Sequence, residues 1–150
     1  MTNTISNGMI TIEELTQVTT EDLAGINKLL PQLSDSAKPL SYQGLLNIVK
    51  NNSATALVIR DGQKLIGFGM LVMFHDLSGT RGRIEDIIVD ESYRGKGFGK
   101  ELMEKLIDLA KKQRVHSIEL SSRPDRAAAN ALYKKLGFEP YETNVYKMKL

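Results

Sequence analysis

Three glycines alternate with three cations in the stretch RGKGFGK, residues 94–100. Glycine weakens regular structure, so it is expected where the backbone bends tightly or lies very close to a ligand. A helical repeat starts directly after this stretch, and the start of a helix combines unpaired N–H groups with a partial positive charge. Such a site suits an anion. The stretch therefore predicts a binding site for a phosphate-bearing ligand.

Two common phosphate-binding motifs fit this loop poorly. A P-loop requires Ser or Thr after its lysine, but Lys100 is followed by Glu101. A dinucleotide-binding fingerprint requires GxGxxG directly after a strand, whereas Lys100 stands at the third glycine position and residues 91–94 separate the loop from the preceding strand-like run. Glu119 lies about where the ribose-binding acid of that fingerprint would fall, so a dinucleotide site stays as the weaker alternative.

A second motif lies downstream, in ANALYKKLGF, residues 129–138. It places an Asn and a Tyr on a predicted helix that is followed by Leu-Gly-Phe. Together with Arg94, Gly97 and Gly99 in the spacing RxxGxG, it resembles the paired signatures of the GNAT superfamily of acetyl-CoA-dependent N-acetyltransferases. The order of predicted elements also resembles that family, so the resemblance covers roughly residues 9–150.

The resemblance implies an α/β (α+β) fold in which helices pack on a sheet. The expected sheet is mixed and mostly antiparallel, with about six to seven strands, and about four helices flank it. One N-acetyltransferase domain would span residues 9–150, and residues 1–8 would form a flexible N-terminus.

By the same resemblance, acetyl-CoA is the cosubstrate, and the glycine loop holds its pyrophosphate through main-chain N–H groups. The strand before the loop would pair with the pantetheine arm, as an added strand pairs with a sheet edge, and the Val89 amide would donate to the thioester carbonyl. The residues implied to contact the coenzyme are Ile87, Ile88, Val89, Arg94, Gly95, Lys96, Gly97, Phe98, Gly99, Lys100, Asn130 and Tyr133.

Acetyl transfer to an amine needs a proton acceptor, because a free amine is mostly protonated at neutral pH. The acidic pair Glu85-Asp86 occupies the strand position where several polyamine and amino-sugar acetyltransferases of the superfamily carry such a pair. Neighbouring side chains on a strand point to opposite faces unless the strand bulges. Only one of the two is then expected in the pocket unless the strand bulges. The resemblance favours Glu85 over Asp86 as the base, and Asp86 is an expected substrate contact.

Tyr133 is the expected acid, since its phenol could return a proton to the leaving thiolate. Ser121 is a second expected substrate contact. It lies on the strand where some ribosomal-protein acetyltransferases carry a glutamate base, and its presence makes a protein N-terminus a less favoured substrate.

The predicted reaction is direct attack of a primary amine on acetyl-CoA in a ternary complex, and the absence of cysteine is consistent with that route. The acceptor is a small metabolite, such as a polyamine or amino sugar, or a peptide or protein amine. Acidic Glu85 and Asp86 favour a cationic acceptor, whereas Arg81, Arg83 and Arg123 could read a phosphate or carboxylate on it, and the sequence leaves both open. The alternative function is a non-catalytic acyl-CoA sensor or regulatory module.

Hydrophobic periodicity predicts the elements that position these residues. Helices are expected at 20–33 after a cap at Thr19 or Thr20, at 42–50, directly after the glycine loop, and at 126–136 between a cap at Asp125 and a stop at Gly137. Strands are expected at 9–15, 82–90, 115–121, 138–141 and 145–150. A hairpin is expected to turn at Asp61-Gly62, and a loop is expected at 75–82.

Length and composition set the remaining expectations. A chain of 150 residues fits one domain with a hydrophobic core, and its net charge of +2 gives no general attraction to nucleic acid. The two histidines, His75 and His116, have no metal-ligand neighbours, so no metal is expected. No long apolar run is present, which predicts a cytoplasmic protein with no membrane partner. A homodimer stays open.

Overall fold

The computed structural model describes residues 2–5 and 8–150 of the chain. Within these residues lies one six-stranded sheet, in which the strands follow one another in sequence order. Its strands are β1 (Thr2–Ile5), β2 (Gly8–Glu14), β3 (Ala54–Asp61), β4 (Lys64–Asp76), β5 (Gly79–Val89) and β6 (Ser117–Glu119). All neighbours up to β5 are antiparallel, and β5 and β6 are parallel. The mixed, mostly antiparallel sheet expected from the sequence is confirmed.

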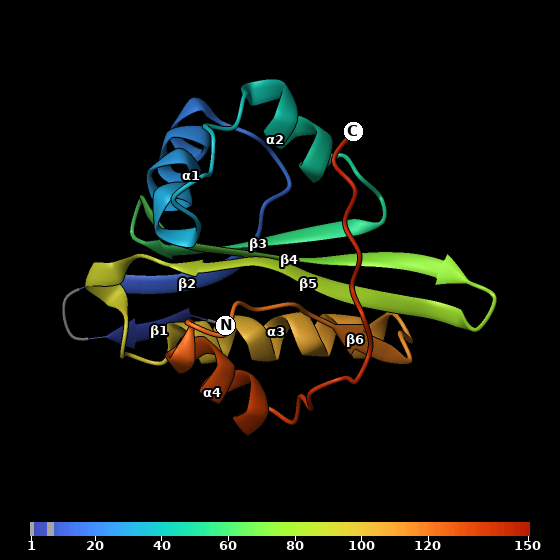
Figure 1. The fold of residues 1–150 in the computed structure, drawn as a ribbon. Coiled ribbons are helices and arrows are strands. Elements are labelled where there is room, and N and C mark those ends of the chain that lie inside the picture. Colours follow the sequence, from blue (N-terminus) through green and yellow to red (C-terminus); the bar gives the residue numbers. More distant parts are fainter. Residues whose placement is uncertain (1, 6–7) are drawn as a thin grey trace.

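Helices cover both faces of the sheet (Figure 1). Helices α1 (Thr20–Leu33) and α2 (Tyr42–Val49) lie on one face, and α3 (Phe98–Lys112) and α4 (Ala127–Lys135) lie on the other. A short 3-10 turn, η1 (Glu91–Tyr93), joins β5 to the glycine loop. Each face has its own apolar core, centred on Leu29 and Leu45 on one side and on Leu102 and Leu106 on the other. The predicted helices are confirmed to within a residue or so at their ends, which matters little for their packing.

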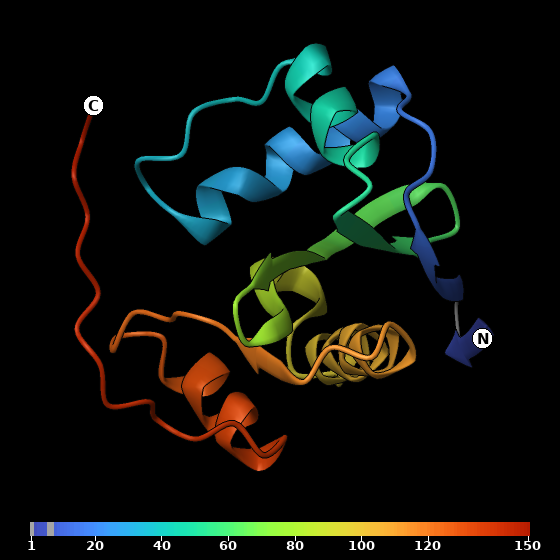
Figure 2. The same ribbon diagram turned by 90° about the vertical axis from the view of Figure 1, so that its right-hand side faces the viewer.

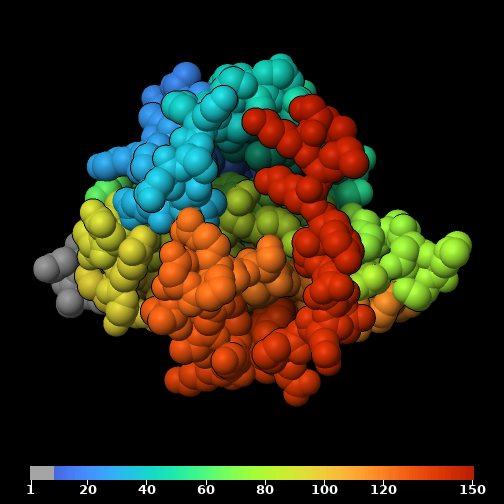
Figure 3. Space-filling model, viewed as in Figure 1, coloured from blue at the N-terminus to red at the C-terminus, as the bar shows by residue number. Residues whose placement is uncertain are grey.

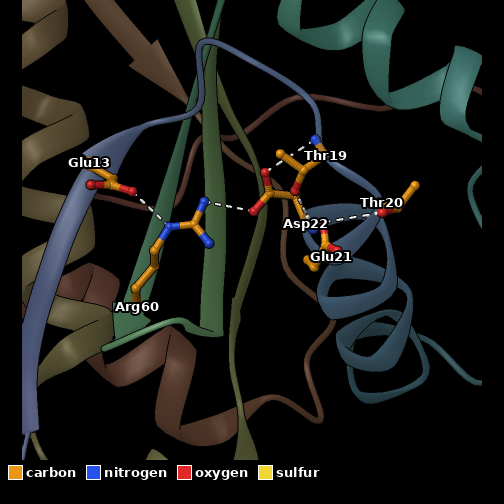
Figure 4. Close-up of polar contacts among 6 residues, drawn as sticks. All are labelled: Glu13, Thr19, Thr20, Glu21, Asp22 and Arg60. Carbon is orange, nitrogen blue, oxygen red and sulfur yellow. Dashed lines mark hydrogen bonds and ion pairs between the residues drawn. The ribbon is translucent and has the colours of Figure 1, made fainter.

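A buried ion pair ties the start of α1 to the sheet (Figure 4). Thr19 caps the helix, and its hydroxyl accepts from the Asp22 amide while the Asp22 carboxylate accepts from the Thr19 amide. Asp22 also accepts from Arg60 of β3 at 2.7 Å, and Arg60 donates to Glu13 of β2 at 2.7 Å. One carboxylate therefore serves both as a helix cap and as the partner of a sheet cation.

Two hairpins form the centre of the sheet. The predicted β3–β4 hairpin is confirmed, but its turn residues are Gly62 and Gln63 and not Asp61 and Gly62, because Asp61 is still paired with Lys64. Gly62 has φ +59°. The loop expected at 75–82 is wrong, because β4 and β5 continue through it and turn at residues 77–78. The Asp76 carboxylate closes this turn by accepting from the Ser78 amide at 2.8 Å. Such side-chain bonds to the backbone replace part of a turn's own bonding.

The C-terminal part of the chain differs most from expectation. The strands predicted at 138–141 and 145–150 are wrong, because residues 138–150 run as an extended segment outside the sheet (Figures 1 and 2). The strand predicted at 115–121 is shorter, since β6 pairs with β5 over only three residues. Alternation of side chains indicates the faces of a strand, but a strand also needs a partner for its backbone groups.

Smaller differences concern two ends. No side chain caps α4 among the described residues, so the predicted cap at Asp125 is wrong; its carboxylate lies 3.6 Å from Arg123 instead. Gly137, with φ +97°, ends that helix as expected. Residues 1–8 were assigned to a flexible N-terminus, but 2–5 form β1 against β2, and residues 1, 6 and 7 lie outside the described residues.

In the part of the chain that the structure describes, no helix has both the length and the apolar character needed to cross a bilayer.

Candidate active site

The sheet opens between β5 and β6. The parallel pairing of these strands joins Arg81–Arg83 to residues 117–119 and then stops, although β5 continues to Val89. Beyond residue 119 the chain leaves the sheet and leads to α4. The second half of β5 therefore has β4 on one side and an open edge on the other. An open edge presents unpaired N–H and C=O groups to whatever lies beside it.

Two hollows lie along this open edge, and they share Ile87 and Arg126. We call the larger one, of about 480 Å³, the outer groove; it is lined by Gln32, Ile87, Ile88, Val89, Arg94, Arg123, Asp125, Arg126 and residues 127–129. We call the smaller one, of about 130 Å³, the inner pocket; it is lined by Leu33, Ile84, Glu85, Asp86, Ile87, Leu120, Ser121, Arg126 and Tyr133. Residues from both predicted motifs therefore meet at one place.

The glycine loop lies at the end of β5 nearest the outer groove. Gly95 has φ +76° and Gly97 has φ +87°, and a Cβ at either position would meet open space. Both positions favour glycine for backbone reasons alone. Gly97 is the N-cap of α3, so the unpaired amides of the first helical turn follow it directly. These features fit a site for a diphosphate group.

The side chains of the three cations of the loop make three different contacts. Arg94 lines the outer groove, and its guanidinium donates to the Val89 carbonyl at 3.1 Å. The Lys96 ammonium lies 5.2 Å from the centre of the Tyr93 ring, a cation–π distance. Lys100 lies 3.6 Å from Glu104, one turn along α3. Of the three, only Arg94 is placed in the groove, and a coenzyme contact by Lys96 or Lys100 stays a prediction.

The backbone of β5 turns two peptide groups toward the hollows. The Ile87 carbonyl accepts from Arg126 at 3.5 Å, and the Val89 carbonyl accepts from Arg94, so both face the open edge. Ile88, between them, is opposite Phe68 of β4. Because the N–H and C=O of one strand residue point to the same side, the Val89 amide also faces the groove. This is the direction that a donor to a bound carbonyl requires.

A bulge in β5 brings the acidic pair together. The register runs from Phe68↔Ile88 to Met70↔Glu85, so two residues, Asp86 and Ile87, stand opposite one residue of β4. Asp86 has φ +56°, which is uncommon for a residue with a side chain. Both carboxylates line the inner pocket as a result. The sequence predicted opposite directions for them unless the strand bulged, and the strand does bulge.

The two carboxylates have different electrostatic surroundings. The Glu85 carboxylate accepts from Arg83 at 2.8 Å. The pKa of Asp86 is raised, first because the pocket walls reduce its hydration and second because the Glu85 carboxylate is adjacent. A raised pKa suits a group that must accept a proton near neutral pH. Asp86 is therefore a second candidate for the base, beside Glu85, which the sequence favours.

Tyr133 of α4 lies at the back of the inner pocket and is 6% exposed. Burial raises the pKa of its phenol, and the Arg126 guanidinium beside it acts in the opposite direction. The phenol therefore keeps its proton at neutral pH. Its ring packs against the Phe138 ring, with ring centres 6.2 Å apart, and this contact holds the Tyr133 side chain in place.

Asn130 does not reach either hollow at the open edge. Its side-chain amide donates to the Arg123 carbonyl at 2.9 Å, and the residue lines another hollow, together with Pro124 and Lys134. Its predicted contact with the coenzyme therefore has no support from its position. The bond to Arg123 instead holds the turn that leads into α4.

Several residues of the site were not predicted from the sequence, and Gln32, Leu33 and Arg126 are among them. Gln32 lines the outer groove and accepts from both the Glu91 amide at 2.8 Å and Arg94 at 3.4 Å, while Leu33 lines the inner pocket. Arg126 lies between the two hollows. Nothing in the sequence pattern could show these roles, because Gln32 and Leu33 are at the end of a helix far away in the chain.

The comparisons with known proteins decide the family. The family model described as "Acetyltransferase (GNAT) family" matches residues 20–138. The chain belongs to this family. It is an acetyl-CoA-dependent N-acetyltransferase, and the elements that line the outer groove and inner pocket fall within the matched range.

Relatives of this acetyltransferase differ in their acceptors. Glucosamine 6-phosphate N-acetyltransferase of Trypanosoma brucei brucei is 31% identical over 137 residues, which cover 86% of this chain and 90% of the relative. N-alpha-acetyltransferase RimI of Mycobacterium tuberculosis is 28% identical over 130 residues, which cover 87% of this chain and 78% of the relative. The first name specifies a sugar phosphate as the acceptor and the second does not. Both names describe acetyl transfer to an amine.

Solved structures share the fold of this acetyltransferase. A crystal structure of a Trypanosoma brucei acetyltransferase superposes with a TM-score of 0.77 at 28% identity, covering 94% of this chain and 99% of the other. An aminoglycoside N-acetyltransferase in complex with CoA gives a TM-score of 0.79 at 18% identity, over 98% of this chain and 99% of the other, and shows the fold alone.

Proposed function

We propose that this acetyltransferase moves the acetyl group of acetyl-CoA to a primary amine that enters through the inner pocket. The observation that carries the proposal is the open edge of β5, with a groove for a long ligand at one end and a carboxylate-lined pocket at the other. Acetyl-CoA brings an activated thioester. The chain's own residues then bind, orient and move protons.

The coenzyme would lie along the outer groove. The amides that follow Gly97 and the guanidinium of Arg94 would hold its diphosphate through charge-assisted bonds, each worth on the order of 1.5–3 kcal/mol. The outward peptide groups of Ile87 and Val89 would pair with the pantetheine arm as a neighbouring strand would. The Val89 amide then lies where it can stabilise negative charge on the thioester oxygen.

Asp86 and Tyr133, which both line the inner pocket, would move the protons. Asp86 accepts the proton that the amine must lose before it can attack, with Glu85 next to it holding Arg83. Tyr133 donates a proton to the departing thiolate, for which its raised pKa keeps it ready. The reaction would proceed by direct attack in a ternary complex, since the chain has no cysteine to form a thioester of its own.

The charges around the inner pocket support a small cationic amine as the acceptor. Arg81 pairs with Asp76 and Glu119, and Arg83 pairs with Glu85 at 2.8 Å and lies 3.7 Å from Glu119. These two arginines are paired with carboxylates, which leaves Asp86 as the pocket carboxylate without an ion pair among the described residues, and the Arg126 guanidinium lies at the border with the outer groove. A volume of about 130 Å³ has room for the reacting end of a polyamine or amino sugar.

An amine panel tests this function. Purified protein is incubated with acetyl-CoA and a set of polyamines, amino sugars, amino-sugar phosphates and peptides, while free thiol is followed. Rapid thiol release with small cationic amines is expected. Tight coenzyme binding by calorimetry without thiol release from any amine would instead support an acyl-CoA sensor. Release only with amino-sugar phosphates or only with peptides would contradict the acceptor class proposed here.

A further inference from the structure

Five charged side chains of alternating sign form a row between the β4–β5 turn and the inner pocket. We call it the charge row; its members, in spatial order, are Asp76, Arg81, Glu119, Arg83 and Glu85. Each neighbouring pair in the row lies within ion-pair distance. The row begins on the β4–β5 hairpin, whose end projects from one side of the molecule (light green in Figure 3). It ends at Glu85, in the lining of the inner pocket.

The strands place these side chains on one face of the sheet. Arg81, Arg83 and Glu85 stand at alternate positions of β5, which turns them to the same side. Glu119 is the register partner of Arg83, at the last position where β5 and β6 pair. The charge row therefore crosses from β5 to β6 and back at the point where the two strands part. The inner pocket begins directly beyond this point.

Glu119 is the central member of the charge row and is shared between two cations. Its Oε1 accepts from Arg81, and its Oε2 lies 3.7 Å from Nη1 of Arg83. The Nε of Arg83 in turn donates to Glu85 at 2.8 Å. One guanidinium is therefore held between two carboxylates, one on each strand. A single exposed ion pair orders its members little, whereas a network of several charges restricts all of them together.

The charge of Arg83 acts on the inner pocket through Glu85. The charged and titratable groups in the lining of this pocket are Glu85, Asp86, Arg126 and Tyr133. The residues that α1 and the segment after β6 add to the lining carry no charge. If Arg83 had Glu85 as its one partner, its full positive charge would act on the acidic pair and oppose the uptake of a proton there. Glu119 balances part of that charge from outside the pocket.

We propose that Glu119 is a positioning residue for acetyl transfer, because it holds Arg83 and, through Arg83, the Glu85 carboxylate beside Asp86. Its carboxylate fixes the direction of the Arg83 guanidinium and takes up part of its charge. The acidic pair thereby keeps its capacity to accept a proton from the amine. The inference rests on the proposed function, in which Asp86 takes that proton.

The variant Glu119→Gln tests this role, because it keeps the shape of the side chain and removes its charge. The unbalanced Arg83 guanidinium should then lower the pKa of Asp86. The acidic limb of kcat/KM, followed by thiol release, should move to lower pH by about half a unit. The titration midpoint of the Asp86 carboxyl, measured by carbon NMR on isotope-labelled protein, should move equally and needs no turnover. The dissociation constant of the coenzyme, measured by calorimetry, should stay unchanged.

Two further variants show whether the effect passes through Arg83. In a chain that already carries Arg83→Gln, the change Glu119→Gln should move the Asp86 midpoint much less than it does in the unmodified chain. Asp76→Asn is the matched control, since it removes a carboxylate from the far end of the same row, which contacts Arg81 and not Arg83. It should leave both the limb and the midpoint in place.

An unchanged Asp86 midpoint in Glu119→Gln, or an equal shift with and without Arg83, overturns the proposal. So does an acidic limb that stays in place while the midpoint moves, because Glu119 would then act on a carboxylate that the reaction does not use. Thiol release from no amine, together with the expected NMR shift, would instead overturn the proposed function and leave the link from Glu119 to Asp86 standing. The two failures are therefore distinguishable.

Discussion

At the bulge of β5, two neighbouring carboxylates have different surroundings, and we expect them to have different roles. Glu85 accepts from Arg83, whereas Asp86 occupies the unusual backbone position and has a raised pKa. A backbone conformation that costs on the order of 1–3 kcal/mol at a non-glycine residue persists only where the surroundings enforce it. This conformation places Asp86 beside Glu85 in the lining of the inner pocket.

The replacement Asp86→Asn should lower kcat/KM by about 100-fold or more, the range in which a lost general base usually falls. In the unmodified protein kcat/KM should fall as pH drops through the raised pKa of Asp86, because the protonated acid cannot accept another proton. The variant should lose this acidic limb. A pH–rate profile measured with thiol detection checks both points.

Glu85→Gln is the matched control for that measurement. The Glu85 carboxylate is one cause of the raised pKa of Asp86, so its removal should move the acidic limb to lower pH while most of the activity stays. If Glu85→Gln abolishes activity and Asp86→Asn does not, Glu85 is the base, as the sequence first indicated.

Tyr133→Phe should reduce kcat by about 100-fold or more, and the dissociation constant of the coenzyme should change little, because the phenol acts on the leaving group. Stopped assays and calorimetry measure the two quantities. Tyr42→Phe is the control: it removes another tyrosine hydroxyl, which bonds the Val18 carbonyl on the far helix layer, and should leave kcat unchanged. A normal kcat in Tyr133→Phe would remove this residue from the mechanism.

Among the elements, the glycine loop is the one whose backbone shape we propose to bind the coenzyme. Gly97→Val should weaken coenzyme binding by about 100-fold or more, the loss expected for two charge-assisted bonds, because valine cannot hold φ +87° without strain. Gly79→Val places the same residue at φ +125° at the start of β5, the opposite end of that strand from the glycine loop. It should destabilise the fold to a similar degree and leave the dissociation constant unchanged, as calorimetry would show. Equal binding losses in both variants would contradict the assignment of the loop.

The contacts of Arg60 with Asp22 and Glu13 predict different losses of stability for two variants (Figure 4). Arg60→Met leaves the buried Asp22 carboxylate without its cation and should lower the free energy of unfolding by about 3 kcal/mol. Glu13→Gln removes the exposed partner of the same arginine and should cost less than about 1 kcal/mol. Urea unfolding measures both values. A cost for Glu13→Gln as large as that for Arg60→Met would show that the buried pair is not the main tie.

The elements show which parts of the structure a sequence can predict. Helices such as Thr20–Leu33 were predictable because cap and apolar stripe lie within the element itself. The β3–β4 hairpin was predictable from Gly62 in its turn. The turn at residues 77–78 was not, since Asp76 closes it with its side chain. The last two strands were predicted from side-chain alternation, which says nothing about whether a backbone partner exists.

The residues of the candidate site also fall into two groups, those that the sequence could indicate and those that it could not. Arg94, Gly97, Asp86 and Tyr133 carried a signal in their residue types and spacing. Arg126 and Gln32 carried none, because they belong to the site only through packing of distant elements. The bulge that turns Glu85 and Asp86 into one pocket depends on the register of β4 against β5, a property of two strands together.

For the whole molecule, the two apolar cores are built on one sheet and share its strands, so we expect them to unfold together. Circular dichroism and tyrosine fluorescence should therefore report the same midpoint in a urea titration. Two separate midpoints would show that the two faces of the sheet unfold independently.

The end of α1 has a consequence for kinetics. Gln32 lies on the groove proposed for the donor, and the next residue, Leu33, forms a wall of the pocket proposed for the acceptor. A donor bound against Gln32 would also hold Leu33 in place, since successive residues of one helical turn cannot move independently. An ordered kinetic scheme follows, in which the donor enters first and the acceptor finds its compartment complete only afterwards.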